Sequence, residues 1–117
     1  MKRDGRVSGL GIDIVKISKI RKLAERNKRF LTRNFTPEEI RYCLGKKRKW
    51  QHLAVRFAAK EAVWKAVGPD VSLKDISIRN APSGKPEAQI KSRNRRNRIL
   101  VSLSHSDHYA AAVAIIL

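Results

Sequence analysis

The chain has 117 residues and carries 27 Lys and Arg against 10 Asp and Glu, for a net charge of +17. Its hydrophobic content of 42% favours one folded domain, residues 1–117, over a disordered basic chain. No apolar stretch is long enough to cross a membrane. The first apolar run is interrupted by glycines, unlike the apolar region of a signal sequence. The single cysteine, Cys43, excludes an internal disulfide. We therefore expect a cytoplasmic protein whose charge attracts a polyanion: nucleic acid, anionic membrane, a phosphorylated cofactor or an acidic protein.

The N-terminal part of the sequence predicts a strand followed by a helix. Segment 7–15, VSGLGIDIV, alternates between a face of large apolar side chains and a face where Asp13 stands with two glycines. In segment 16–30 the apolar residues recur at helical intervals, which predicts an amphipathic helix. The outer face of this helix is strongly basic and presents Lys19, Lys22, Arg26 and Arg29.

Two further helices are predicted in the middle of the chain. A TPEE tetrapeptide is a well-formed helix start, with Thr36 as the N-cap and Glu39 closing a capping box. This short helix is expected to end near Gly45. A long central helix follows over 53–67 and is terminated by Gly68 and the proline after it.

The central helix is apolar or small on nearly every side, which predicts that it is buried. It nevertheless carries Lys60 inside its apolar stripe, and Glu61 as the one acid between Glu39 and Asp70. Charges on a buried helix need partners. Glu61 and Lys65 have the i,i+4 spacing of a helix salt bridge, so this pair is one interpretation.

A second interpretation joins Glu61 to Asp13 on the first strand. Two carboxylates from rigid elements, with cations nearby, suit a magnesium-phosphate site, because Mg²⁺ takes one or two protein carboxylates and completes its shell with phosphate oxygens and water. Asp13 could instead cap the helix that begins near Lys16. His105, at a predicted strand end, could be a packed or surface histidine.

Beyond the central helix the periodicity changes to two and predicts strands. The turn NAPSGK joins the first pair, a basic segment KSRNRRNR (91–98) follows, and a tight loop joins the last pair. One N-terminal strand, about three helices and then antiparallel strands predict an α+β fold. The four C-terminal strands are expected over 71–79, 86–91, 99–105 and 109–117.

Four segments of the sequence resemble the holo-acyl-carrier-protein synthases, the small bacterial 4′-phosphopantetheinyl transferases. They are GLGIDIV, RFAAKEAVWKAVG, SGKP and VSLSHSDHYAAAVAI, and they occur in family order. The resemblance implies a 4′-phosphopantetheinyl transferase-like fold and Mg²⁺-dependent transfer of 4′-phosphopantetheine from coenzyme A to a serine of acyl carrier protein. Adenosine 3′,5′-bisphosphate would be released, and the reaction would support fatty acid biosynthesis. It also implies a homotrimer with active sites between subunits.

The resemblance also assigns roles to residues. It places the metal ligands at Asp13 and Glu61, with Lys65 beside them as a third catalytic residue, and the coenzyme A-binding cations at Lys47, Arg56, Lys65 and His105. The family docks an acidic helix of the carrier protein against its first helix, which corresponds to the basic face defined above.

The chain departs from the family pattern in three places: Val55 replaces a usual glycine, the loop after Gly68 is shorter, and only KSRNRRNR stands where many members have a helix. The alternative function is a small basic nucleic-acid-binding protein, which the net charge favours. Against it, the sequence has no recognised nucleic-acid-binding signature and no aromatic platform on a strand. A ribosome-associated structural protein would rest on charge alone.

Overall fold

The computed structural model describes residues 6–91 and 98–117. It confirms an α+β fold, with four α-helices rather than about three, and with its strands in two antiparallel sheets of order β1-β5-β4 and β2-β3. The elements in chain order are β1 (Gly9–Lys16), α1 (Ile17–Arg26), α2 (Arg29–Asn34), α3 (Pro37–Leu44), α4 (Lys49–Val67), a 3-10 helix (Leu73–Asp75), β2 (Ile76–Asn80), β3 (Pro86–Ile90), β4 (Ile99–His105) and β5 (Tyr109–Ile116). The predicted basic connection KSRNRRNR lies mostly outside the described residues.

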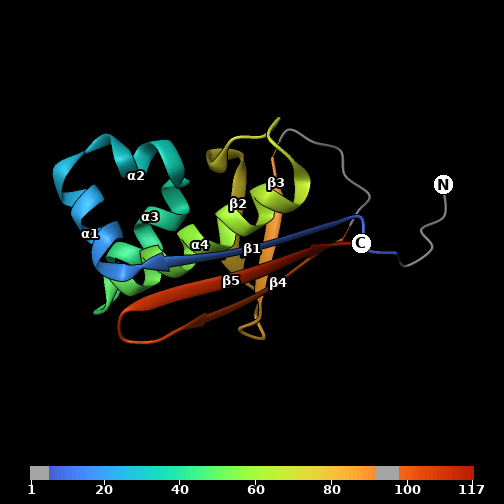
Figure 1. Cartoon of the computed structure of the whole chain (residues 1–117). Helices are drawn as coiled ribbons and strands as arrows, with labels where there is room; N and C mark the ends of the chain where they lie inside the picture. Colours follow the sequence, from blue (N-terminus) through green and yellow to red (C-terminus); the bar gives the residue numbers. More distant parts are fainter. Residues whose placement is uncertain (1–5, 92–97) are drawn as a thin grey trace.

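The long helix α4 runs along the three-stranded sheet, and the three short helices gather at one end of it (Figure 1). The β2–β3 hairpin lies on the other side of α4 from β1 (Figure 1). Alanines of α4 and β5 fill the space between helix and sheet; Ala58, Ala59, Ala62, Ala112 and Ala114 are all buried. Small side chains let the helix lie close to the sheet, so α4 is the central buried helix that the sequence predicted.

The glycine face of β1 packs directly against the backbone of α4. A Cβ atom at Gly11 would overlap the carbonyl oxygen of Ala62, and one at Gly9 would overlap the carbonyl oxygen of Ala66. Only glycine allows this approach between a strand and a helix. Because Asp13 lies on the same face of β1, the approach also brings its carboxylate to the surface of α4.

The opposite face of the sheet is apolar and exposed. Leu10, Ile12 and Ile14 on β1 are between 65% and 69% exposed. Their cross-strand neighbours on β5 are apolar as well and include Val113 and Ile115. The predicted alternation of β1 is therefore confirmed, and its large side chains form the outer face of the sheet.

The predicted basic helix over 16–30 is divided into two. α1 ends at Arg26 and α2 begins at Arg29, because the Asn27 side chain accepts a hydrogen bond from the backbone N–H of Arg29 (3.0 Å). The break directs the side chain of Phe30 toward two other aromatic rings. Its ring centroid lies 6.2 Å from that of Phe35 and 5.6 Å from that of Phe57. Arg29 consequently belongs to α2, not to the helix that carries Lys19, Lys22 and Arg26.

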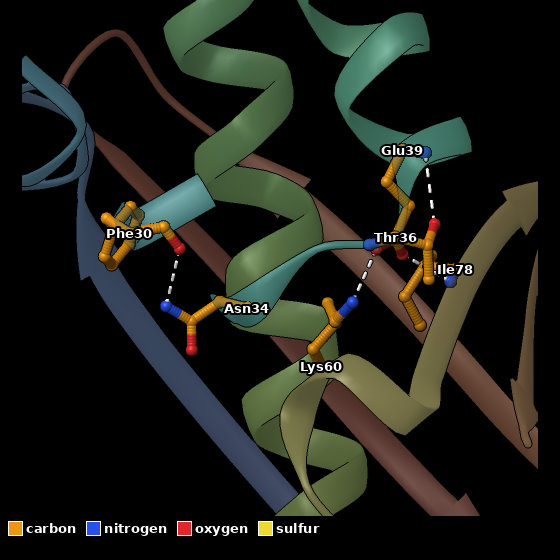
Figure 2. Close-up of polar contacts among 6 residues, drawn as sticks. All are labelled: Phe30, Asn34, Thr36, Glu39, Lys60 and Ile78. Carbon is orange, nitrogen blue, oxygen red and sulfur yellow. Dashed lines mark hydrogen bonds and ion pairs between the residues drawn. The ribbon is translucent and has the colours of Figure 1, made fainter. Parts of the chain in front are cut away.

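The predicted capping box is present, and its carboxylate has two further partners. Thr36 and Glu39 exchange the two hydrogen bonds of the box, and Glu39 also accepts from the Lys60 ammonium of α4 and from the backbone N–H of Ile78 on β2 (2.7 Å) (Figure 2). Glu39 is 3% exposed and Lys60 is fully buried. The cation inside the apolar stripe of α4 is thus paired with a residue of α3.

Two elements begin four or five residues away from the predicted position. α4 begins at Lys49, four residues before the expected start, and β2 begins at Ile76 rather than at position 71. Before β2, Val71 turns inward and accepts a hydrogen bond from the indole of Trp64 (2.9 Å), and a 3-10 helix follows. No helix in the described part of the chain is long and apolar enough to span a membrane.

Candidate active site

Asp13 and Lys65 form the centre of the first candidate cluster. The Lys65 ammonium donates to Oδ1 of Asp13 (3.1 Å) and to the carbonyl oxygen of Ile12 (3.0 Å). The second carboxylate oxygen of Asp13, Oδ2, is buried and has no hydrogen-bond partner among the described residues. A buried carboxylate oxygen without a donor is costly unless a cation approaches it. This atom therefore marks a place for a cationic ligand.

Glu61 lies on α4 one turn before Lys65 and is half-buried. Burial raises the pKa of its carboxyl group, the negative charge of Asp13 raises this pKa further, and Lys65 opposes the shift. The two carboxylates therefore sense each other's charge. A cation shared between them would relieve both the repulsion and the cost of burial.

The predicted alternatives for these carboxylates, a Glu61–Lys65 salt bridge and Asp13 as a helix cap, are both wrong. Lys65 pairs with Asp13 instead of Glu61, because β1 approaches α4 so closely that the strand carboxylate reaches the ammonium. Asp13 does not cap the following helix either, since the N-cap of α1 is Lys16 and no side chain caps it.

The donor set of this cluster matches a divalent ion that a substrate helps to hold. The described residues contain no group of three or more His, Cys, Asp or Glu that could cage a metal alone. Mg²⁺ does not need such a cage, because it is commonly bound by one or two carboxylates together with substrate phosphates and water. The unpartnered Oδ2 of Asp13 and the nearby Glu61 carboxylate fit that requirement.

Arg56 and His105 form part of a second cluster, around a hollow of about 410 Å³. Gly84, Lys85 and Pro86, from the predicted SGKP turn, line the same hollow. The Gln51 side-chain amide lies 3.0 Å from Nε2 of His105. Arg56 is 5% exposed, and its guanidinium lies 4.2 Å from the ring centroid of Tyr42.

Lys47 is not part of this second cluster. It lines a separate hollow of about 290 Å³ together with Trp50 and Asp107. Its neighbour Lys46 instead reaches the second cluster, where its ammonium lies 4.6 Å from the ring centroid of Tyr42. Sequence reasoning missed Lys46 and Tyr42, because two adjacent lysines in a loop give no periodicity that distinguishes them.

The two clusters are separate from each other within one protomer. Asp13 is on β1 and His105 on β4, which are the opposite edges of the three-stranded sheet, about 10 Å apart at ordinary strand spacing. Arg56 and Glu61 are five residues apart on α4, so their side chains leave the helix about 140° from each other. The structure thus brings together Asp13, Glu61 and Lys65, and separately Arg56 and His105.

Comparison with known proteins agrees with this geometry. The family model described as "4′-phosphopantetheinyl transferase superfamily" matches residues 9–114. The chain belongs to the 4′-phosphopantetheinyl transferase superfamily. Its most similar relatives include the holo-[acyl-carrier-protein] synthase of Moorella thermoacetica, 44% identical over 91% of each chain, and that of Anoxybacillus flavithermus, 46% identical over 94% of this chain and 95% of the relative.

A solved member of the superfamily has the same fold. The holo-(acyl-carrier-protein) synthase of Bacillus anthracis, in complex with CoA (3′,5′-ADP), superposes with a TM-score of 0.82 at 37% identity and covers 94% of this chain and 96% of its own. The resemblance read from the four motifs is therefore confirmed, and the chain is by family a 4′-phosphopantetheinyl transferase.

Proposed function

We propose that this protein transfers 4′-phosphopantetheine from coenzyme A to a serine of apo-acyl carrier protein. The serine oxygen bonds to the phosphorus that carries pantetheine, the bond to the other phosphate breaks, and adenosine 3′,5′-bisphosphate leaves. The product, holo-acyl carrier protein, would serve fatty acid biosynthesis in the cytoplasm. The observation that carries this proposal is the buried Oδ2 of Asp13, which has no hydrogen-bond partner in the described chain, on a carboxylate close enough to Glu61 to raise the pKa of Glu61.

Asp13 and Glu61 are the residues that would hold Mg²⁺, which when bound would neutralise the pyrophosphate and stabilise the leaving phosphate. The Lys65 ammonium donates two of its three N–H groups to Asp13 and Ile12, so one remains to donate to a phosphate oxygen. Glu61, directly or through a water molecule, takes the serine proton.

The direct test uses magnesium, coenzyme A and an unmodified carrier protein. Mass spectrometry should show that the carrier gains the mass of one phosphopantetheine and that the gain is lost when its serine is replaced by alanine. Removal of magnesium by a chelator should stop the reaction, and added Mg²⁺ should restore it. A carrier that gains no mass under these conditions would refute the proposed activity.

Coenzyme A is proposed to bind between two subunits of a homotrimer. His105 lies on β4, at the sheet edge opposite to Asp13, and Arg56 leaves α4 in a different direction from Glu61, which supports a site whose two halves come from neighbouring protomers. The exposed face that carries Ile12 and its apolar neighbours supports the same assembly, because soluble proteins rarely leave so many large apolar side chains side by side in water.

Mixing two inactive variants tests the shared site. Glu61→Gln removes one half and Arg56→Ala the other, so each protein alone should transfer poorly. After the two are unfolded and refolded together, activity should recover to about a quarter of wild type, the fraction of interfaces at random assembly that join two intact halves. No recovery, with trimers present by analytical ultracentrifugation, would place the whole site within one protomer.

The basic face of Lys19, Lys22, Arg26 and Arg29 is proposed to dock the acidic carrier protein. All four side chains are exposed, although they belong to two helices. Lys22→Glu with Arg26→Glu should raise the KM for carrier protein by about tenfold and flatten its dependence on salt, because exposed charges mainly govern encounter. The KM for coenzyme A should not change. Equal increases in both KM values would contradict docking on this face.

A further inference from the structure

Tyr42, on α3, stands at the centre of the second cluster and has no role in the proposed function. The Arg56 guanidinium and the Lys46 ammonium lie 4.2 and 4.6 Å from the centroid of its ring. The imidazole of His52 packs edge-on against the same ring, with the centroids 5.9 Å apart. The phenol oxygen accepts a hydrogen bond from the Asn80 side chain (3.2 Å). One ring therefore contacts three basic side chains and is itself tied to β2.

These basic groups have no paired carboxylate in the described part of the chain, where neither Arg56, Lys46 nor His52 forms an ion pair with an acid. Burial lowers the pKa of His52, and the charges of Arg56, Lys46 and His105 lower it further. Four basic groups are thus close enough to affect one another. Arg56 and Lys46 are cations without an ion-pair partner among the described residues, and such a pair favours the binding of an anion.

The same residues line the hollow in which the phosphate-bearing end of coenzyme A is proposed to bind. Tyr42, His52, Arg56 and His105 all contribute to its wall. Lys46 lies over the tyrosine ring that forms part of this wall. A phosphate monoester entering here would meet the planar fork of the buried guanidinium, which suits two parallel hydrogen bonds to phosphate oxygens.

We propose that Tyr42 is the positioning residue that makes this hollow select a terminal phosphate monoester. Its ring holds Arg56 and Lys46 through cation–π contacts, so the two cations are in place before the anion arrives. Preorganised groups lose less entropy on binding. The inference rests on the proposed function and deepens it: the selected ligand is a nucleotide with a 3′-phosphate, and Lys46 is the lysine that Tyr42 orients.

Two substitutions separate the ring from its hydroxyl. Tyr42→Leu removes the ring, whereas Tyr42→Phe keeps the ring and loses only the hydrogen bond to Asn80. Binding of coenzyme A and of dephospho-coenzyme A is measured by calorimetry, and transfer from each donor is measured in parallel. Tyr42→Leu should raise the Kd for coenzyme A by about tenfold and leave that for dephospho-coenzyme A within about twofold. Tyr42→Phe should keep the wild-type preference, and kcat should change little in both variants.

Lys46→Ala should reduce the preference for coenzyme A as well, since it removes one of the two cations over the ring. Lys28→Ala makes the same change in net charge at an exposed position between α1 and α2, outside the hollows that Tyr42 lines, and should leave the preference intact. If the wild type transfers and prefers coenzyme A but Tyr42→Leu keeps this preference, the inference about Tyr42 is wrong while the proposed function stands. A wild type that transfers from neither donor would overturn both.

Discussion

Glu61→Gln and Asp13→Asn are each expected to slow phosphopantetheine transfer by on the order of 100- to 1,000-fold, the effect of removing one preorganised charge stabiliser from an active site. Each substitution neutralises a carboxylate without changing its shape. The Lys65 ammonium can still donate to the amide oxygen that replaces Oδ1 of Asp13, so the melting temperature should not fall. Steady-state rates at limiting magnesium, together with thermal melting curves, measure both effects.

Glu87→Gln is the matched control for this pair of variants. Glu87 is exposed on β3 and belongs to neither candidate cluster, so its neutralisation should leave transfer unchanged. Magnesium affinity, measured by calorimetry in the presence of adenosine 3′,5′-bisphosphate, should fall in the two site variants and not in the control. Near-normal transfer by either site variant at limiting magnesium would remove Asp13 and Glu61 from the metal site.

Glu39→Ala is expected to lower the free energy of unfolding by about 3–5 kcal/mol, because it leaves a fully buried lysine without its counter-charge. It also removes the side-chain acceptor for the backbone N–H of Thr36, which is one of the two bonds of the capping box, and the acceptor for the backbone N–H of Ile78 (Figure 2). Urea unfolding measures the change. A Glu39→Ala protein as stable as the wild type would show that the pair contributes nothing to the fold.

The double variant Glu39→Gln with Lys60→Met separates the effect of the two charges from that of side-chain packing. It removes both charges and keeps side chains of similar length, so it should recover most of the stability that Glu39→Gln alone loses. A loss of stability in the double variant equal to the sum of the losses in Glu39→Gln and Lys60→Met would show that the two residues act independently.

The Glu39→Gln variant should also gain stability as the pH rises toward the ordinary pKa of lysine, about 10.4. Burial lowers the pKa of Lys60, and Glu39 opposes this shift in the wild type. Without the carboxylate the folded-state pKa falls further, so over this interval the unfolded chain binds more protons than the folded chain. The free energy of unfolding therefore rises with pH. A pH series of urea midpoints compares this slope with that of the wild type.

Local patterns predicted much of the fold. The Thr36 cap, the end of α4 at Gly68 and the limits of β4 follow from contacts within a few residues, and the structure confirms them. The division between α1 and α2 could not be predicted in the same way. No glycine or proline marks the boundary between the two helices. The ring of Phe30 contacts that of Phe57, which is remote in sequence.

The candidate site shows the same limit. Asp13 and Glu61 could be proposed as partners because each stands out within its own element, yet the ammonium that meets Asp13 depends on the depth to which β1 packs on α4. Glu39 was predicted only as a cap. Its bond to Lys60 spans 21 residues of sequence and becomes visible only when α3 and α4 are placed side by side.

The close packing of β1 on α4 has a consequence for how this site can change. Where Gly9 and Gly11 meet the carbonyl groups of Ala62 and Ala66, two backbones are in contact and no side chain lies between them that could be made larger or smaller. The spacing between the elements that carry Asp13 and Glu61 is therefore set by main-chain atoms. Substitutions elsewhere in the core can alter stability while this spacing persists, whereas one added methyl group at Gly11 would change it directly.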